Sequence, residues 1–223
     1  MNTKATIIKE NVTAERRKEI WEMGKTQKFV QPTIYIIKPT EPTLSIHGTD
    51  PLSKYINESE VPTGTSIIRI DANKNSGVVY TDSNTVLVRI FGSIFDILSA
   101  RREFVNVAIQ TLDKYGIKAK LSSHRPGAND LVVEVDGKEK KFSGSYTELS
   151  QSYFSFFITL DFNSEVVKDL YRLDTDKFSA RGNILSISDA VCGLREVKSD
   201  IDESIVDEIV KSLISKLNYT NPN

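Results

Sequence analysis

The sequence is poor in the two residue types that most often build metal centres and crosslinks. It has one cysteine and two histidines. A single cysteine cannot form a disulfide within the chain, and this usage is typical of a reducing compartment, so we expect a cytoplasmic protein. The cysteine and the two histidines lie far apart in the sequence, which argues against a zinc site of the usual kind.

Other absences narrow the class of partner. Lysine and arginine total 29 against 30 acidic residues, so no excess of positive charge favours nucleic acid. No apolar stretch approaches the length of a membrane span, and no apolar run near the N-terminus indicates a signal peptide. We therefore expect neither nucleic acid nor a membrane as partner. Repeats, low-complexity tracts and linkers are also missing, so residues 1–223 are predicted to form one domain.

The patterns that are present predict an α+β fold. A helix begins after Thr13, a candidate N-cap, and presents a charged outer face. Two longer helices are expected at 96–115, where Gly116 ends the apolar stripe, and at 202–218. The predicted strands are 34–37, 43–48, 65–70, 78–82, 84–91, 117–121, 131–135 and 153–162, and 78–82 is expected to pair with 84–91. Many short strands with few helices favour a mixed, mainly antiparallel sheet packed by the two long helices.

A hairpin near the middle of the chain is the most informative stretch. Its first strand starts at Leu131, its turn is Asp136-Gly137, and its return strand carries Lys140 and Lys141 before ending in Ser143-Gly144-Ser145. Both central residues of a type I′ turn need positive φ, which Asp-Gly supplies. Asn129 and Asp130 stand at its entrance. A lysine held near small polar residues suits an anion such as a phosphate, whereas the simpler interpretation is an ordinary exposed hairpin.

The same stretch resembles the centre of the lipoate–protein ligase family, which has the biotin/lipoate ligase fold with a class II synthetase-like catalytic domain. The family pattern is Arg-Asn-Asp-Leu, a hairpin, then Lys-(Val/Ile)-Ser-Gly-Ser-Ala. The resemblance implies that Lys141 is the catalytic lysine, and that Asn129 and Asp130 serve the nucleotide, Asp130 also binding its magnesium. Ser143 and Gly144 fall in the part of this motif that binds the acyl-adenylate.

A second stretch resembles the glycine-rich motif of that family. Gly77, Val79, Asp82 and Asn84 match it, and the resemblance implies nucleotide or acyl-adenylate contacts at Gly77 and Asp82. Thr159-Leu160 matches the end of the family strand His-His-Gly-Thr-Leu-Leu, so Thr159 joins the predicted acyl pocket. Three departures are clear: Asn75-Ser76 replace two glycines, Asp71-Ala72 replace two arginines, and Thr81 replaces a histidine. Lys74 is then a candidate phosphate contact.

The resemblance implies an enzyme that uses ATP and Mg²⁺ to activate a carboxylic acid, lipoate or a medium-chain acid, as acyl-AMP. The acyl group would pass to a target lysine on an acceptor protein. The resemblance spans about residues 33–217 and corresponds to the large domain of those ligases only.

Two alternatives stay open. One is ATP-independent acyl transfer through a thioester on Cys192, although no histidine lies near it in the sequence and nothing indicates a lowered thiol pKa. The other is a binding or scaffold protein that kept the fold and lost catalysis, which the three departures favour. His47 is a candidate acid–base residue whose simpler role is that of a residue at a strand end.

Overall fold

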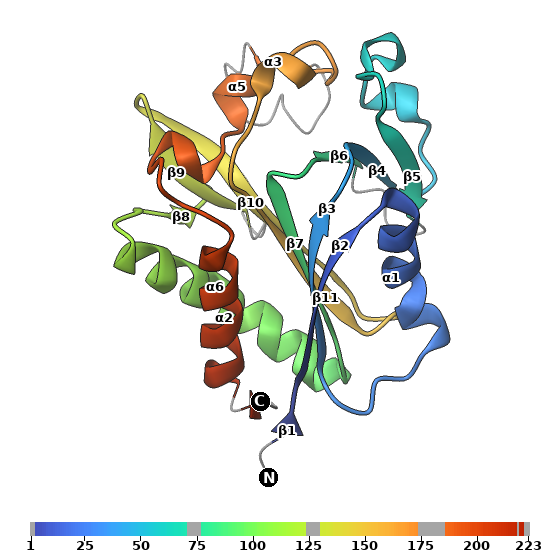
Figure 1. The fold of residues 1–223 in the computed structure, drawn as a ribbon, viewed down its shortest axis with the longest axis vertical. Helices are drawn as coiled ribbons and strands as arrows, with labels where there is room; N and C mark the ends of the chain where they lie inside the picture. Colours follow the sequence, from blue (N-terminus) through green and yellow to red (C-terminus); the bar gives the residue numbers. More distant parts are fainter. Residues whose placement is uncertain (1–2, 71–76, 124–129, 174–185, 218, 221–223) are drawn as a thin grey trace.

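A seven-stranded sheet forms the centre of the computed structural model, which describes residues 3–70, 77–123, 130–173, 186–217 and 219–220. Its strand order is β2-β3-β7-β11-β10-β9-β8, and only β2 and β3 run parallel (Figure 1). The strands are β2 (Thr6–Val12), β3 (Thr33–Pro39), β7 (Thr85–Phe91), β8 (Lys120–Leu121), β9 (Leu131–Val135), β10 (Lys138–Glu148) and β11 (Tyr153–Thr159). The predicted mixed, mainly antiparallel α+β fold is confirmed.

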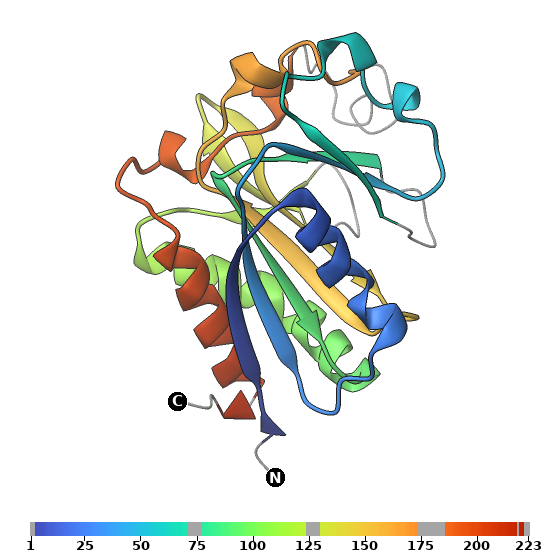
Figure 2. The same cartoon turned by 45° about the vertical axis from the view of Figure 1, so that its right-hand side comes forward.

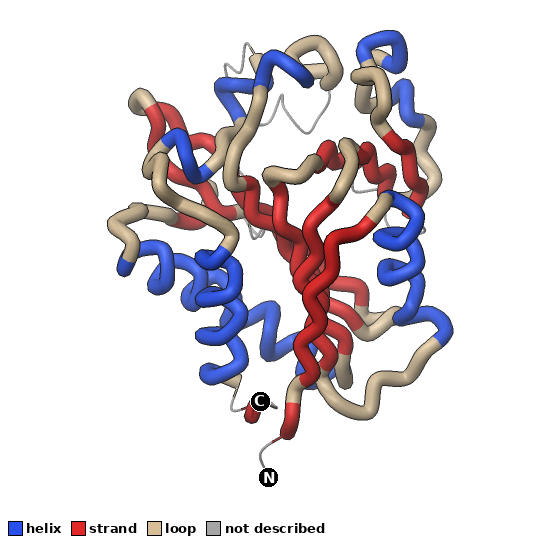
Figure 3. The backbone as a smooth tube through the Cα atoms, in the orientation of Figure 1, coloured by secondary structure: helices blue, strands red, loops and turns tan. Residues whose placement is uncertain are grey.

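A second sheet of three strands lies beside the large one (Figure 3). Its order is β5 (Ser66–Ile70), β4 (Thr43–His47) and β6 (Gly77–Thr81), with β4 parallel to β5 and antiparallel to β6. The expectation that 78–82 and 84–91 pair with each other is wrong. Strand β7 already pairs with β3 on one edge and β11 on the other, so β6 has no free edge to join.

Two helices cover one face of the large sheet. They are α2 (Ile94–Lys114) and α6 (Ser204–Lys216), close to the predicted limits. Ser93 and Asp96 form a capping box at the start of α2, and Gly116, with φ of 78°, follows its end. Their apolar stripes pack with strand residues such as Val88 and Phe156 into the largest hydrophobic core. This face is therefore built from aliphatic and aromatic side chains.

Helix α1 (Ala14–Thr26) lies on the opposite side of the sheet from α2 (Figure 2). Thr13 is its N-cap, as predicted, because its side chain accepts a hydrogen bond from the Arg16 amide at 3.3 Å. Trp21 is buried beneath it in a second core with Tyr153 and Phe91. The helix places Arg17 in this buried layer too, so its charged outer face is narrower than the sequence suggests.

The remaining elements are short. Strands β1 (Thr3–Lys4) and β12 (Tyr219–Thr220) pair in parallel near the termini. Helices α3 (Ser164–Val167) and α5 (Ile187–Ala190) lie together above the end of the large sheet (Figure 1). The other short helical turns are 3₁₀ turns at Leu52–Lys54, Glu58–Glu60 and Leu194–Glu196. In the part of the chain that is described, no helix is long and apolar enough to cross a membrane.

Candidate active site

The predicted hairpin places Lys141 in the middle of the large sheet. Asp136 and Gly137 have φ of 52° and 73°, the left-handed values of a type I′ turn. Strand β10 does not end at Ser145 but continues to Glu148, because it pairs along its second half with β11. Lys141 pairs with β9 on one side, and on the other side it forms an isolated bridge with Val191, where the Cys192 amide donates to the Lys141 carbonyl at 3.0 Å.

A β-bulge at Phe142 sets the direction of the side chains around Lys141. Lys141 pairs with Val132 and Ser143 pairs with the next residue, Leu131, so β10 contains one extra residue. Phe142 packs into the core beneath α2 and α6. Because of the extra residue, Lys141 and Gly144 fall on the same face, the one away from those helices.

Lys141 is held by a buried ion pair. Its ammonium nitrogen lies 2.8 Å from Oδ1 of Asp130, and the two side chains are 17% and 10% exposed. Gly144 makes room for the pair. A Cβ at this position would lie 2.8 Å from Nζ of Lys141 and 3.1 Å from Oδ1 of Asp130. The hairpin thus brings Asp130, Lys141 and Gly144 together.

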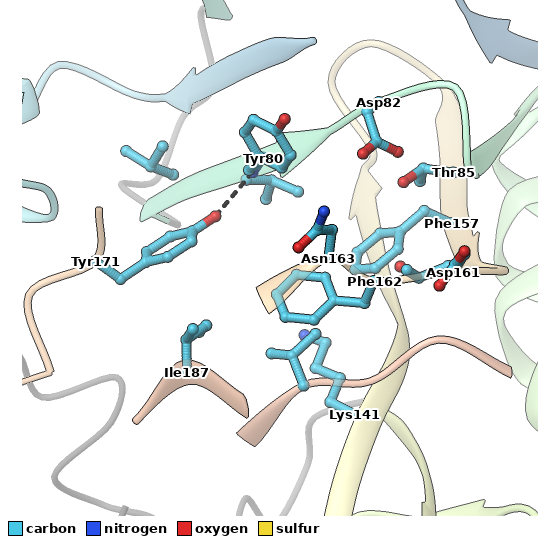
Figure 4. Close-up of a pocket in the computed structure, with 14 residues that line it drawn as sticks. Tyr80, Asp82, Thr85, Lys141, Phe157, Asp161, Phe162, Asn163, Tyr171 and Ile187 are labelled. Atoms are coloured by element: carbon cyan, nitrogen blue, oxygen red, sulfur yellow. Dashed lines mark hydrogen bonds between the residues drawn. The ribbon is translucent and has the colours of Figure 1, made fainter. Parts of the chain in front are cut away.

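The Lys141 side chain reaches into a cavity at the end of the sheet (Figure 4). Apolar and aromatic side chains from several elements form most of its wall, while two carboxylates, two threonines, one asparagine and Lys141 line the rest. Figure 4 shows Lys141 entering from one side and Asp82 with Thr85 lying across from it. The lining residues are Val78, Val79, Tyr80, Asp82, Thr85, Lys141, Phe157, Thr159, Asp161, Phe162, Asn163, Tyr171, Ile187 and Val191.

Each carboxylate of the cavity comes from the end of a strand. Asp82 follows β6, and its Oδ1 accepts a hydrogen bond from the Asn84 amide at 2.8 Å. Burial raises the pKa of Asp82, and the nearby Asp161 raises it further, while the Asn84 amide opposes this. Asp161 lies two residues after Thr159. The cavity therefore has a cationic side at Lys141 and an acidic side at Asp82 and Asp161.

The other predicted site residues are placed differently. Thr159 lines the cavity beside its cross-strand partner Thr85. Gly77 begins β6 with φ of 90°, next to the lining residue Val78, without lining the cavity itself. Ser143 is fully buried opposite Ile158, whose side chain belongs to the core beneath the helices. A ligand in the cavity would meet its backbone and not its hydroxyl. Asn129 and the loop 71–76, including Lys74, lie outside the described residues.

Several lining residues were missed in the sequence. Asp161 continues the alternation of Phe157 and Thr159, so that spacing was an available signal. No signal in the sequence pointed to Tyr171. Its hydroxyl accepts a hydrogen bond from the Tyr80 amide at 2.8 Å and joins the small sheet to the segment after β11. Ile187 and Val191 are brought in by α5, which packs on β10.

Cys192 and His47, two candidate catalytic residues in the sequence, occupy positions that fit structural roles. Cys192 is completely buried, and burial raises the pKa of its thiol to about 12. A thiol in this state is a poor nucleophile, which disfavours a thioester mechanism. His47 is buried at the end of β4, with its ring edge-on to Trp21 at 5.3 Å between centroids. It does not line the cavity of Lys141.

The fold and the lysine-bearing hairpin can now be compared with known protein families. Residues 21–218 match the model of the lipoyl protein ligase A/B catalytic domain. The chain belongs to this family, as the hairpin motif predicted. No curated protein matches the sequence.

Solved structures show the same fold at low sequence identity. A bipartite lipoate protein ligase from Thermoplasma acidophilum, studied with its E2 lipoyl domain, superposes with a TM-score of 0.73 and 11% identity over 100% of this chain and 88% of that one. P. falciparum LipL1 in complex with lipoate gives 0.70 and 14%, over 97% and 65%. A lipoate–protein ligase A bound with ATP gives 0.67 and 12%, over 100% and 90%.

Proposed function

We propose that this chain is a lipoate ligase-like enzyme that activates a carboxylic acid as acyl-AMP and transfers the acyl group to a lysine of an acceptor protein. The observation that carries the proposal is the Lys141 ammonium, fixed by Asp130 at 2.8 Å and directed into a largely apolar cavity. A hairpin needs no buried lysine to fold. A fixed positive charge beside an apolar wall suits the head of an acid whose tail is apolar.

Lys141 would act through its charge. When the acid's carboxylate attacks the α-phosphate of ATP and pyrophosphate leaves, negative charge builds up on the phosphate oxygens, and a preorganised ammonium stabilises it. Asp130 keeps the ammonium in place before substrate arrives. In the second step the amine of the acceptor's lysine would attack the acyl carbonyl and AMP would leave; the amine must lose a proton, and the carboxylates of Asp82 and Asp161 lie across the same cavity to receive it.

Mg²⁺ fits this site only together with ATP. In the described part of the chain, no three histidine, cysteine or carboxylate side chains gather to hold a metal alone. Mg²⁺ in nucleotide enzymes is commonly held by one or two carboxylates plus substrate phosphates. Asp130 would supply one such carboxylate, and the metal would neutralise phosphate charge.

The relatives support the choice of substrates. Structures of this fold have been described with lipoate, with ATP and with an E2 lipoyl domain. We therefore propose ATP as the activating nucleotide, a lipoate-like or medium-chain acid as the small substrate, and a protein carrying a target lysine as acceptor. The cysteine usage alone leads us to propose a cytoplasmic setting.

The test is ATP–pyrophosphate exchange with a panel of acids that includes lipoate and octanoate. Exchange that depends on one acid and on Mg²⁺ is the expected result. A chain that neither binds ATP nor exchanges pyrophosphate with any acid would refute the ligase and leave the scaffold as the better description. Acyl transfer from a preformed thioester donor without ATP would instead point to a transferase.

A further inference from the structure

Two arginines are completely enclosed on the α1 side of the large sheet. Arg17 comes from α1 and Arg89 from β7, and each is 1% exposed. Both lie against Trp21: the guanidinium carbon of Arg89 is 3.4 Å from its ring centroid and that of Arg17 is 5.6 Å away. Arg89 is also 3.8 Å from the ring of Tyr153, so its planar group is stacked between two aromatic faces.

The hydrogen bonds of this cluster are incomplete. Nη1 of Arg17 donates to Oγ1 of Thr81 at 2.5 Å, and Nη1 of Arg89 donates to the Trp21 carbonyl at 2.8 Å. Among the residues that the structure describes, four buried donors of this cluster have no hydrogen-bond acceptor: Nε of Arg17, Nε and Nη2 of Arg89, and Nε1 of Trp21. The Tyr153 hydroxyl lies near Trp21 and Arg89 but makes no aligned hydrogen bond with either. Stacking occupies the faces of the Arg89 guanidinium, while Nε and Nη2 on its edge have no acceptor.

Neither guanidinium has a carboxylate partner within the described part of the chain. The acid on this face, Glu148, accepts hydrogen bonds from the hydroxyls of Tyr146 and Ser150 at 3.1 and 2.7 Å. Burial lowers the pKa of both arginines to about 9, so both stay charged at neutral pH. Two enclosed charges with three unsatisfied donors between them, beside the unsatisfied Trp21 Nε1, favour an acceptor that carries negative charge.

The strand register connects this cluster to the cavity. Thr85, which lines the cavity, alternates along β7 with Leu87 and then Arg89 on the same face. Thr85 and Arg89 are four residue steps apart along the strand, about 13 Å at the usual rise. Between them lies Phe157, which lines the cavity and also packs against the core that contains Trp21.

We propose that Arg17 and Arg89 bind a carboxylate at the far end of the acid whose near carboxylate faces Lys141. The substrate class is then an α,ω-dicarboxylic acid of medium length, with Phe157 turning aside as the chain enters. This inference rests on the proposed function, because it names the acid for that site. The guanidinium edges would form charge-assisted hydrogen bonds that a terminal methyl group cannot form.

Binding of azelate and of nonanoate, measured by calorimetry and by the shift in Tm without ATP, tests the proposal on the unmodified chain. We expect azelate to bind at least about tenfold more tightly than nonanoate. Arg17→Met and Arg89→Met should abolish that preference. Arg16→Met is the matched control, because Arg16 is exposed on the same helix and pairs with Glu10 and Glu19, and it should keep the preference. Phe157→Ala should improve azelate binding by opening the path.

A free anion is the other ligand that Arg17 and Arg89 would bind through the same charge-assisted hydrogen bonds. Adding acetate at constant ionic strength distinguishes a free anion from a dicarboxylic acid. If acetate stabilises the wild type but not Arg89→Met, and azelate binds no better than nonanoate, the dicarboxylic substrate is refuted. Equal binding of azelate and nonanoate without any effect of acetate refutes the anion site altogether. Exchange of pyrophosphate with monocarboxylic acids only would keep the ligase and reject this inference. Preferred azelate binding without any exchange would keep the inference and reject the ligase.

Discussion

The two faces of the seven-stranded sheet are made by the same strands but have opposite characters. The face beneath α2 and α6 is packed with apolar side chains, such as Val86, Val88 and Phe156. The opposite face carries the partly exposed Lys141 and the buried Arg89 and Thr159, together with aromatic rings. Enclosing polar and charged groups is costly unless they are paired. The first face therefore supplies stability, and the second gives some of it up.

The largest effect should come from the helix-covered face. Phe104 is fully buried on α2, and its ring stacks on that of Phe156 with 4.2 Å between centroids. Phe104→Ala should lower the free energy of unfolding by about 3–5 kcal/mol, as measured by urea denaturation. Phe95→Ala is the control, because Phe95 on the same helix is 76% exposed and should change little. Similar losses for the two variants would contradict the assignment of stability to this face.

Lys141→Ala should mainly affect chemistry. Loss of a preorganised charge opposite a developing anion typically costs about 10²–10³-fold in rate, which pyrophosphate exchange would show. The buried Asp130 would lose its cation, so the free energy of unfolding should also fall by roughly 1–3 kcal/mol.

Lys140→Ala is the control that separates the effect of Lys141→Ala on the exchange rate from its effect on stability. Lys140 is the neighbouring residue and pairs with Glu196 at 3.5 Å. It does not line the cavity, so exchange should stay near the wild-type rate. Equal loss of exchange in both variants would show that stability, and not the Lys141 charge, governs the rate.

Gly144→Ala should have a smaller effect, again confined to the cavity face. The new methyl group would displace the Lys141 ammonium, which can move because it ends a flexible side chain. We expect a change in stability within about 1 kcal/mol and a drop in exchange of about tenfold. Ser145→Ala, one residue further and opposite the core residue Phe156, should retain wild-type exchange. Unchanged exchange in Gly144→Ala would mean that the ion-pair geometry is not critical.

The smallest effect concerns Asp82. Burial raises its pKa in the folded state, so the native protein holds this proton more tightly than the unfolded chain. The resulting stability is present below the ordinary pKa of an aspartate and is lost as pH rises through the raised value. Asp82→Asn should flatten that part of the stability–pH curve, followed by urea denaturation in steps of pH. A curve identical to that of the wild type would show that Asp82 titrates normally.

The sequence predicted the elements that depend on local chemistry. Helices α2 and α6 were predicted from their apolar stripes, and the hairpin from Asp136-Gly137. Elements that depend on distant pairing were missed: no local signal shows that β6 leaves the large sheet or that Tyr171 reaches the cavity. From the sequence the hairpin could equally be an ordinary exposed one, because the pairing of Lys141 with Asp130 is recognised only once the register is known. Buried arginines such as Arg17 look like surface residues in a charged helix.

Because of the bulge at Phe142, the number of residues between Lys141 and Gly144 matters for the site as much as their types. Everything on β10 after the bulge is assigned to a face by counting from Lys141. Inserting one residue between the bulge and Gly144 would turn Gly144 toward α2 and place the inserted residue against the ammonium, whereas deleting the extra residue would restore a regular strand in which Lys141 and Gly144 still share a face. A single insertion in this segment should therefore disturb the cavity face more than removal of the bulge. Any transfer of this motif to another sheet must keep its spacing as well as its residues.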